Sequence, residues 1–184
     1  MATAFRRTRD GVVGKLDQGE RDLLTRLFDD VARLLEDGLD DTADPLEALV
    51  GIDPDACVPD DPALARLLPI GTTQDDALAG EFRRYTEIGL RKRKSANLRA
   101  AARSLADRDT VRLDDGTLAA WLTALTDVRL VLGERLGLRS DADAEELQAA
   151  LDDADDSDPR AWLAAVYDFL TWLQETLVHA ASPR

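Results

Sequence analysis

Three segments of the chain place apolar residues every three or four positions, which is the spacing of an amphipathic helix. In the first segment, Asp17 and Glu20 have the capping-box spacing, and the periodic apolar residues continue up to Gly38. The second and most apolar segment, Gly116–Leu136, predicts a central helix that other helices cover. The third segment predicts a C-terminal helix over residues 159–181. Together they predict a helical core.

Between the first and second segments, the pattern predicts two short helices and one long one. The short helices begin at Asp44-Pro45 and at Asp61-Pro62, because proline is favoured at the first position of a helix. The long helix begins at Thr73 and continues through Leu105. The apolar stripe through which it is expected to pack consists of Leu78, Phe82, Tyr85, Ile88 and Gly89.

Strand patterns are few and short. Residues 5–15 predict an antiparallel β-hairpin with Asp10-Gly11 as its two-residue turn. Thr110–Leu113 predicts a brief strand that pairs with this hairpin. Residues 139–158 are acid-rich and predict one short helix followed by a solvated linker. Because strands do not alternate with the helices, we expect one mainly α domain over residues 1–184, α+β at most, and not an α/β protein.

The composition agrees with a folded domain and restricts its location. Apolar residues make up 45% of the 184 residues, which is enough for a core, and no apolar run approaches the roughly 20 residues that span a bilayer. The N-terminal sequence MATAFRRTRDG lacks the apolar stretch of a signal peptide, so we expect a cytoplasmic protein without membrane contact. Cys57 is the single cysteine, which excludes an internal disulfide and a Cys-rich zinc site.

No arrangement of residues in the sequence indicates catalysis. His179 is the single histidine and lies five residues from the end of the chain. HExxH, GxGxxG and Walker motifs do not occur. Pairs of aspartates are frequent, but in a chain with 37 acidic residues they are typical of solvated faces and helix caps. The sequence therefore predicts a non-enzymatic protein without catalytic residues, cofactor or metal site.

The charge distribution is uneven. The formal net charge is −14, yet residues 81–103 carry +6, which leaves −20 on the remainder. One interpretation is that these basic side chains pair with the protein's own acids. The other is a docking surface for a partner protein, since four of them share a sector of about 100° on a continuous helix: Arg83, Arg84, Arg91 and Lys94. Direct DNA binding is not predicted, because the remainder is acidic and no recognition-helix pattern occurs.

Two single residues suggest further roles. Arg129 falls inside the apolar stripe of the central helix, where an unpaired charge would be costly, and Glu81 flanks the stripe of the 73–105 helix. The sequence therefore predicts a buried Glu81–Arg129 ion pair, with a ligand-binding role for Arg129 as the alternative. Cys57 is interpreted as a small, half-buried apolar residue, with a redox role as the alternative. Its acidic sequence neighbours disfavour a reactive thiolate.

Three segments together carry a family resemblance: EFRRYTEIGLRKRK (81–94), WLTALTDVRLVLGERLGL (121–138) and YDFLTWLQETLV (167–178). They are similar to an actinobacterial family that was first described as a domain of unknown function and is associated with the oxidative-stress regulator AosR. The resemblance covers most of the chain, including the DPLEAL and DPALARLLP segments.

The resemblance implies an intracellular, non-enzymatic transcriptional regulator that responds to oxidative stress and contacts a sigma factor or RNA polymerase. It also links the protein to genes for sulfur transfer in cysteine biosynthesis and for Clp proteolysis, so a scaffold protein for that machinery is the alternative. The redox switch described for the family uses two closely spaced cysteines, whereas this chain has Cys57 alone. The redox trigger is therefore either intermolecular or absent, and the sequence leaves a homodimer open.

Overall fold

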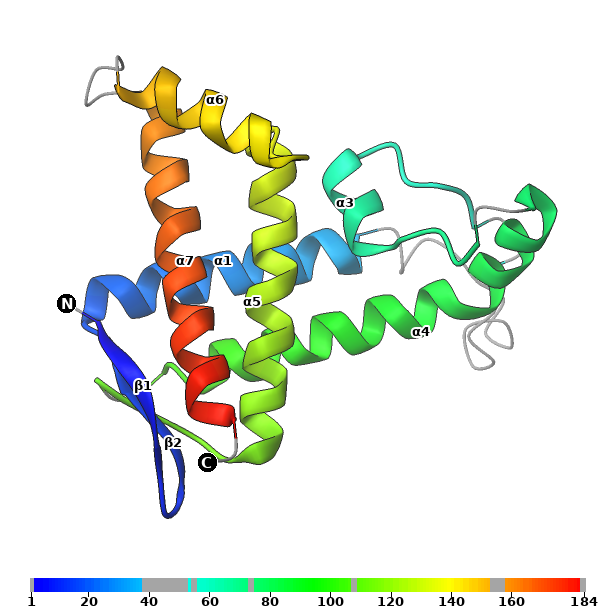
Figure 1. Ribbon diagram of the computed structural model, residues 1–184. Coiled ribbons are helices and arrows are strands. Elements are labelled where there is room, and N and C mark those ends of the chain that lie inside the picture. The colour runs from blue at the N-terminus through cyan, green and yellow to red at the C-terminus, as the bar shows by residue number, and fades with distance from the viewer. Residues whose placement is uncertain are drawn as a thin grey trace.

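The computed structural model of the chain has a helical body with a small sheet at one end (Figure 1). It contains six helices and three strands within the residues that it describes, which confirms the predicted mainly α class. The described residues are 2–37, 53, 56–72, 75–106, 109–152 and 158–182. Gly38, Thr73 and the short helix predicted after Asp44-Pro45 lie outside the described residues.

The sheet is antiparallel and has the strand order β1-β2-β3. Its strands are β1 (Thr3–Thr8), β2 (Gly11–Lys15) and β3 (Thr110–Leu113). Thr8 pairs with Gly11, so the hairpin turn is Arg9-Asp10 and not the predicted Asp10-Gly11. Gly11 has a φ of 121°, which favours glycine, and a Cβ at this position would overlap the carbonyl oxygen of Leu113. Glycine therefore lets β3 approach the hairpin closely.

Aspartate N-caps account for the starts of the first helices. α1 (Gln18–Glu36) begins with a capping box, because Asp17 accepts from the Glu20 N–H and the Glu20 side chain accepts from the Asp17 N–H. α3 (Pro62–Leu67) has Asp61 as its N-cap and proline in its first turn, as predicted. α4 (Asp76–Arg103) begins after Asp75, whose carboxylate accepts from two backbone N–H groups.

α5 (Asp115–Leu136) is the central helix that the sequence predicts, and it packs against α1, α3, α4, α7 and β3. Trp121 on α5 is fully buried and meets Phe5 and Phe28 edge-on, with ring centroids 5.7 and 5.6 Å away. Its indole Nε1 donates to Ser104 Oγ at 2.8 Å, so the polar atom of this large side chain is satisfied.

α7 (Pro159–Ala181) lies beside α5, and α6 (Asp141–Asp152) crosses one end of both helices (Figure 1). Leu147 on α6 packs with Leu136 and Ala164 in a small second apolar cluster. At the opposite end, α7 packs against β1. Among the described helices, none combines the length and apolar character that crossing a membrane requires.

Candidate functional site

The face of α4 that packs against the protein carries charged side chains. Arg83 and Glu87 are 8% and 7% exposed, and Arg83 Nη1 lies 2.5 Å from Glu87 Oε2. Arg91 donates to Glu87 Oε1 from Nε and from Nη2, at 2.9 and 2.8 Å. Glu87 therefore lies between two guanidinium groups, each about one helical turn away, in charge-assisted hydrogen bonds.

Both arginines also reach the ends of other helices. Arg83 Nη2 donates to the backbone oxygen of Leu68, the C-cap residue of α3, at 3.3 Å. Arg91 Nη1 donates to the backbone oxygens of Leu35 and Asp37 at the end of α1, at 3.3 and 3.4 Å. Helix C-termini leave carbonyl groups unsatisfied and carry partial negative charge, so guanidinium groups are favourable there.

Farther along α4, two more cations bind acids on neighbouring helices. Lys94 Nζ donates to the carboxylate of Asp127 on α5, and Arg99 lies 2.7 Å from both Asp29 and Glu36 on α1. Hydrogen bonds from Arg99 and Ser95 hold the pKa of Glu36 below its ordinary value. α4 is thus linked to α1, α3 and α5 through its own charged side chains.

Asp127 is the most buried acid of this set. Its residue is 1% exposed, and its Oδ2 has no hydrogen-bond partner among the described residues. Burial raises the pKa of its carboxyl above the ordinary value, while the hydrogen bond and the charge of Lys94 oppose that rise.

The four basic side chains predicted to dock a partner are not on one exposed surface. Arg84 is exposed, whereas Arg83 is buried and Arg91 and Lys94 are half-buried in the ion pairs described above. The docking prediction is therefore wrong for Arg83, Arg91 and Lys94, which pair with the protein's own acids. The sequence spacing could have indicated these ion pairs, because Glu87 lies four residues from both Arg83 and Arg91.

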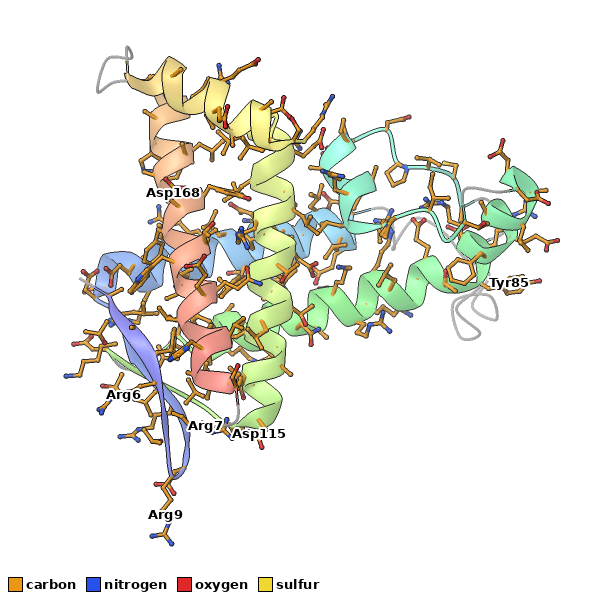
Figure 2. The ribbon with its side chains drawn as sticks, in the orientation of Figure 1. Arg6, Arg7, Arg9, Tyr85, Asp115 and Asp168 are labelled. Atoms are coloured by element: carbon orange, nitrogen blue, oxygen red, sulfur yellow. The ribbon has the colours of Figure 1, made fainter. Side chains whose placement is uncertain are left out.

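The apolar stripe of the same helix faces outward instead. Leu78, Phe82 and Tyr85 are 55%, 53% and 65% exposed, and within the predicted packing stripe Ile88 is the buried side chain. Figure 2 shows Tyr85 at the end of α4 that lies far from the sheet. The prediction that this stripe packs inside the protein is therefore wrong for its first three members.

One more exposed apolar side chain precedes α4, and α4 carries exposed charges. Ile70, in the connection before α4, is 53% exposed, and Gly71 lies against the Phe82 ring. On α4 itself Arg84, Lys92 and Arg93 are exposed and form no ion pair with another described residue. We call Leu78, Phe82 and Tyr85 the α4 apolar face.

The predicted Glu81–Arg129 ion pair does not form. Arg129 Nη1 donates to Gln174 Oε1 on α7 at 2.8 Å, and its guanidinium lies 5.2 Å from the centre of the Tyr167 ring. Glu81 is exposed on α4. The prediction assumed that the α4 side of α5 carries Arg129, whereas this residue lies on the side that packs against α7.

Cys57 is exposed in the stretch before α3, and not half-buried as its main interpretation predicts. Its thiol is therefore open to reaction with another molecule. Among the described residues, no group of three His, Cys, Asp or Glu side chains is arranged to hold a metal ion.

Comparison with protein-family models matches residues 2–181 to the family described as Domain of unknown function (DUF2017). The chain belongs to this family. No curated protein and no solved structure matches the chain. The family description assigns no activity, so the AosR-like relationship and the actinobacterial origin stay predictions.

Proposed function

We propose that this family member is a non-enzymatic regulatory protein of the cytoplasm that acts by contacting another protein through the α4 apolar face. The observation that carries the proposal is the exposure of Leu78, Phe82 and Tyr85, each more than half accessible on one side of one helix. Clustered exposed apolar side chains are characteristic of interaction sites. Aromatic residues in particular contribute much of the binding energy in protein interfaces.

The exposed charges along α4 indicate the charge of the partner. Arg84, Lys92 and Arg93 are exposed cations on the same helix, and they outnumber its exposed acids, Asp76 and Glu81. A partner with an apolar groove and an acidic rim would match this surface. Charges at the rim would speed association more than they would tighten the complex.

The family resemblance supports the choice of partner. It implies a sigma factor or RNA polymerase, and hence a transcriptional regulator of the oxidative-stress response. The alternative is an interaction or scaffold protein that serves sulfur transfer in cysteine biosynthesis or Clp proteolysis.

An affinity capture from the native host, followed by mass spectrometry, tests the proposal. The bait is the full chain, compared with Phe82→Ser/Tyr85→Ser and with the matched control Trp162→Ser, which alters an exposed aromatic residue on α7. We expect wild type and the control to capture sigma factor or polymerase, and the double variant to lose it. Thermal melting should show that all three proteins are folded.

Two results would go against the proposal. Sulfur-carrier or Clp proteins, lost in the double variant, would favour the scaffold alternative and keep the α4 apolar face as the contact. Identical captures by the wild type and the double variant would show that this face does not bind the partner.

A further inference from the structure

A groove of about 710 Å³ lies between β1 and the C-terminal end of α7. The strand side consists of Phe5 and the next four residues, and the helix side of residues 179–182. Its volume is within the range of roughly 300–1,000 Å³ typical of ligand pockets. Figure 2 shows Arg6, Arg7 and Arg9 projecting from this hairpin, on the opposite side of the molecule from Tyr85. The groove is thus separate from the α4 apolar face.

Part of the strand edge in this groove is open. β1 is at the edge of the sheet, and Thr8 pairs with Gly11 next to the two-residue turn. Because paired residues alternate along an antiparallel ladder, Arg7 directs its backbone N–H and C=O away from β2. The Phe5 N–H, on the same edge, donates to Thr176 Oγ1 on α7 at 3.3 Å. α7 therefore closes the edge at Phe5 and leaves it open at Arg7.

The groove also concentrates positive charge. Arg6 and Arg9 are exposed and form no ion pair with another described residue. Arg7 lies 3.6 Å from Asp115, but both side chains are more than half exposed, so this pair contributes little. The C-terminal end of α7 offers a partial negative charge of about one half, which three guanidinium groups outweigh. Charges elsewhere on the acidic chain are screened beyond about 8 Å at physiological salt.

We propose that this groove binds a short, extended acidic segment of a partner protein, which adds to the free edge of β1 at Arg7. Backbone hydrogen bonds to the strand supply affinity in this mode of recognition, and side chains supply specificity. Arg7 shares a face of the sheet with Val12, and Arg6 shares the other face with Val13. Carboxylates on one face of the added segment would therefore meet Arg7 and those on the other face Arg6, with Arg9 at the turn beyond them. None of these residues belongs to the basic 81–103 segment, which carries a net charge of +6.

A second copy of the chain fits the edge of β1 less well than an acidic segment does. Pairing β1 with β1 of another copy would bring the arginines of both strands together, and like charges on adjacent strands are destabilising. Charged side chains on an edge strand are a common means of preventing such pairing. The same charges attract a strand of opposite sign.

Fluorescence anisotropy with three labelled peptides tests the proposal on the full chain. The first peptide alternates Glu and Val, the second alternates Lys and Val, and the third is the Glu-Val peptide with alternate backbone nitrogens methylated. We expect the Glu-Val peptide to bind, and the other two to bind at least tenfold more weakly. Methylation removes backbone donors and leaves the carboxylates in place, so it separates strand addition from simple charge attraction.

Variants of the protein supply the second arm. Arg6→Gln/Arg7→Gln/Arg9→Gln removes the cations on both faces of the strand and should weaken binding of the Glu-Val peptide at least tenfold. Arg112→Gln is the matched control, because Arg112 is exposed on β3 and does not line the groove, and it should change binding less than twofold. Failure of the Glu-Val peptide to bind, or equal binding of the methylated peptide, would overturn the proposal. Equal weakening by Arg112→Gln, or dimerisation of the chain that the triple variant abolishes, would do the same.

Discussion

Lys94 on α4 donates to Asp127 on α5, and the two side chains differ in their access to water. The side chain of Asp127 is 1% exposed, whereas that of Lys94 is 16% exposed. A long lysine side chain can turn its ammonium group toward solvent if it loses its partner. The short aspartate side chain in the helix interface cannot. The pair is therefore asymmetric, and the buried carboxylate depends on the lysine.

Lys94→Met should therefore destabilise the protein more than Asp127→Asn. Removing the lysine leaves a buried carboxylate without its cation, which costs about 3 kcal/mol. Asp127→Asn keeps the shape of the side chain and removes the buried charge, so we expect a loss of about 1 kcal/mol. Urea unfolding at pH 7 measures both values. Equal losses would show that the lysine is as dependent on the pair as the aspartate.

The loss in Lys94→Met should also shrink at low pH. Burial raises the pKa of Asp127 in the folded protein, and Lys94 opposes the rise, so its removal should raise this pKa further. A carboxyl with a raised folded-state pKa costs stability above that pKa and costs nothing below its ordinary value, where it is protonated in both states. The difference in unfolding free energy from wild type should fall as the pH goes from 7 toward about 4. A constant difference over this interval would contradict the assignment.

Glu87→Ala should be among the most damaging changes on α4. Glu87 is buried between Arg83 and Arg91, and its removal leaves one buried and one half-buried guanidinium group without a carboxylate. We expect a loss of about 3 kcal/mol in unfolding free energy.

Glu81→Ala is the matched control for this change, because Glu81 is exposed on the same helix. A surface substitution of this kind should stay within about 0.5 kcal/mol of wild type. Denaturant unfolding measures the unfolding free energies of both variants. Similar values for Glu81→Ala and Glu87→Ala would mean that the Glu87 ion pairs add nothing to stability.

The sequence predicted the helices well because caps and apolar period are local properties. The expected helix starts are found at Asp17 with Glu20 and at Asp61 with Pro62. The apolar segment around Trp121 forms the expected central helix. The hairpin turn was displaced by one residue, because Gly11 is needed beside Leu113 of β3. That contact joins residues about 100 positions apart, and local turn preference could not include it.

The orientation of α4 could not be predicted by the same means. Its stripe of Leu78, Phe82 and Tyr85 is the usual pattern of a packed face, and arginines usually face solvent. In the structure the apolar stripe faces solvent and the arginines face the protein. Glu87 and the carbonyl oxygens of α1 and α3 accept hydrogen bonds from Arg83 and Arg91 on the inner side. Those acceptors come from other parts of the chain, so a helix considered alone gives the wrong face.

Arg129→Ala should cost about 1 kcal/mol, less than a buried ion pair would. The guanidinium donates to the neutral amide of Gln174 and lies over the Tyr167 ring, so its removal strands no carboxylate. Gln174→Ala should cost a similar amount, and the double variant should cost less than the sum of the two single changes. A thermal or urea double-mutant cycle measures this coupling. A loss of about 3 kcal/mol or more in Arg129→Ala would instead indicate a carboxylate partner.

Cys57 should react as an accessible thiol in the folded protein. It is exposed in the stretch before α3, and as the single cysteine it can form a disulfide only with another molecule. A thiol reagent such as Ellman's reagent should modify one group per chain in native buffer, within roughly threefold of the rate in urea, because exposure already permits attack.

Mild oxidation should produce a covalent dimer on a non-reducing gel, and Cys57→Ser should stay a monomer with an unchanged melting temperature. Modification that occurs only after unfolding would show that the thiol is shielded, and an intermolecular redox response through Cys57 would then have no physical basis.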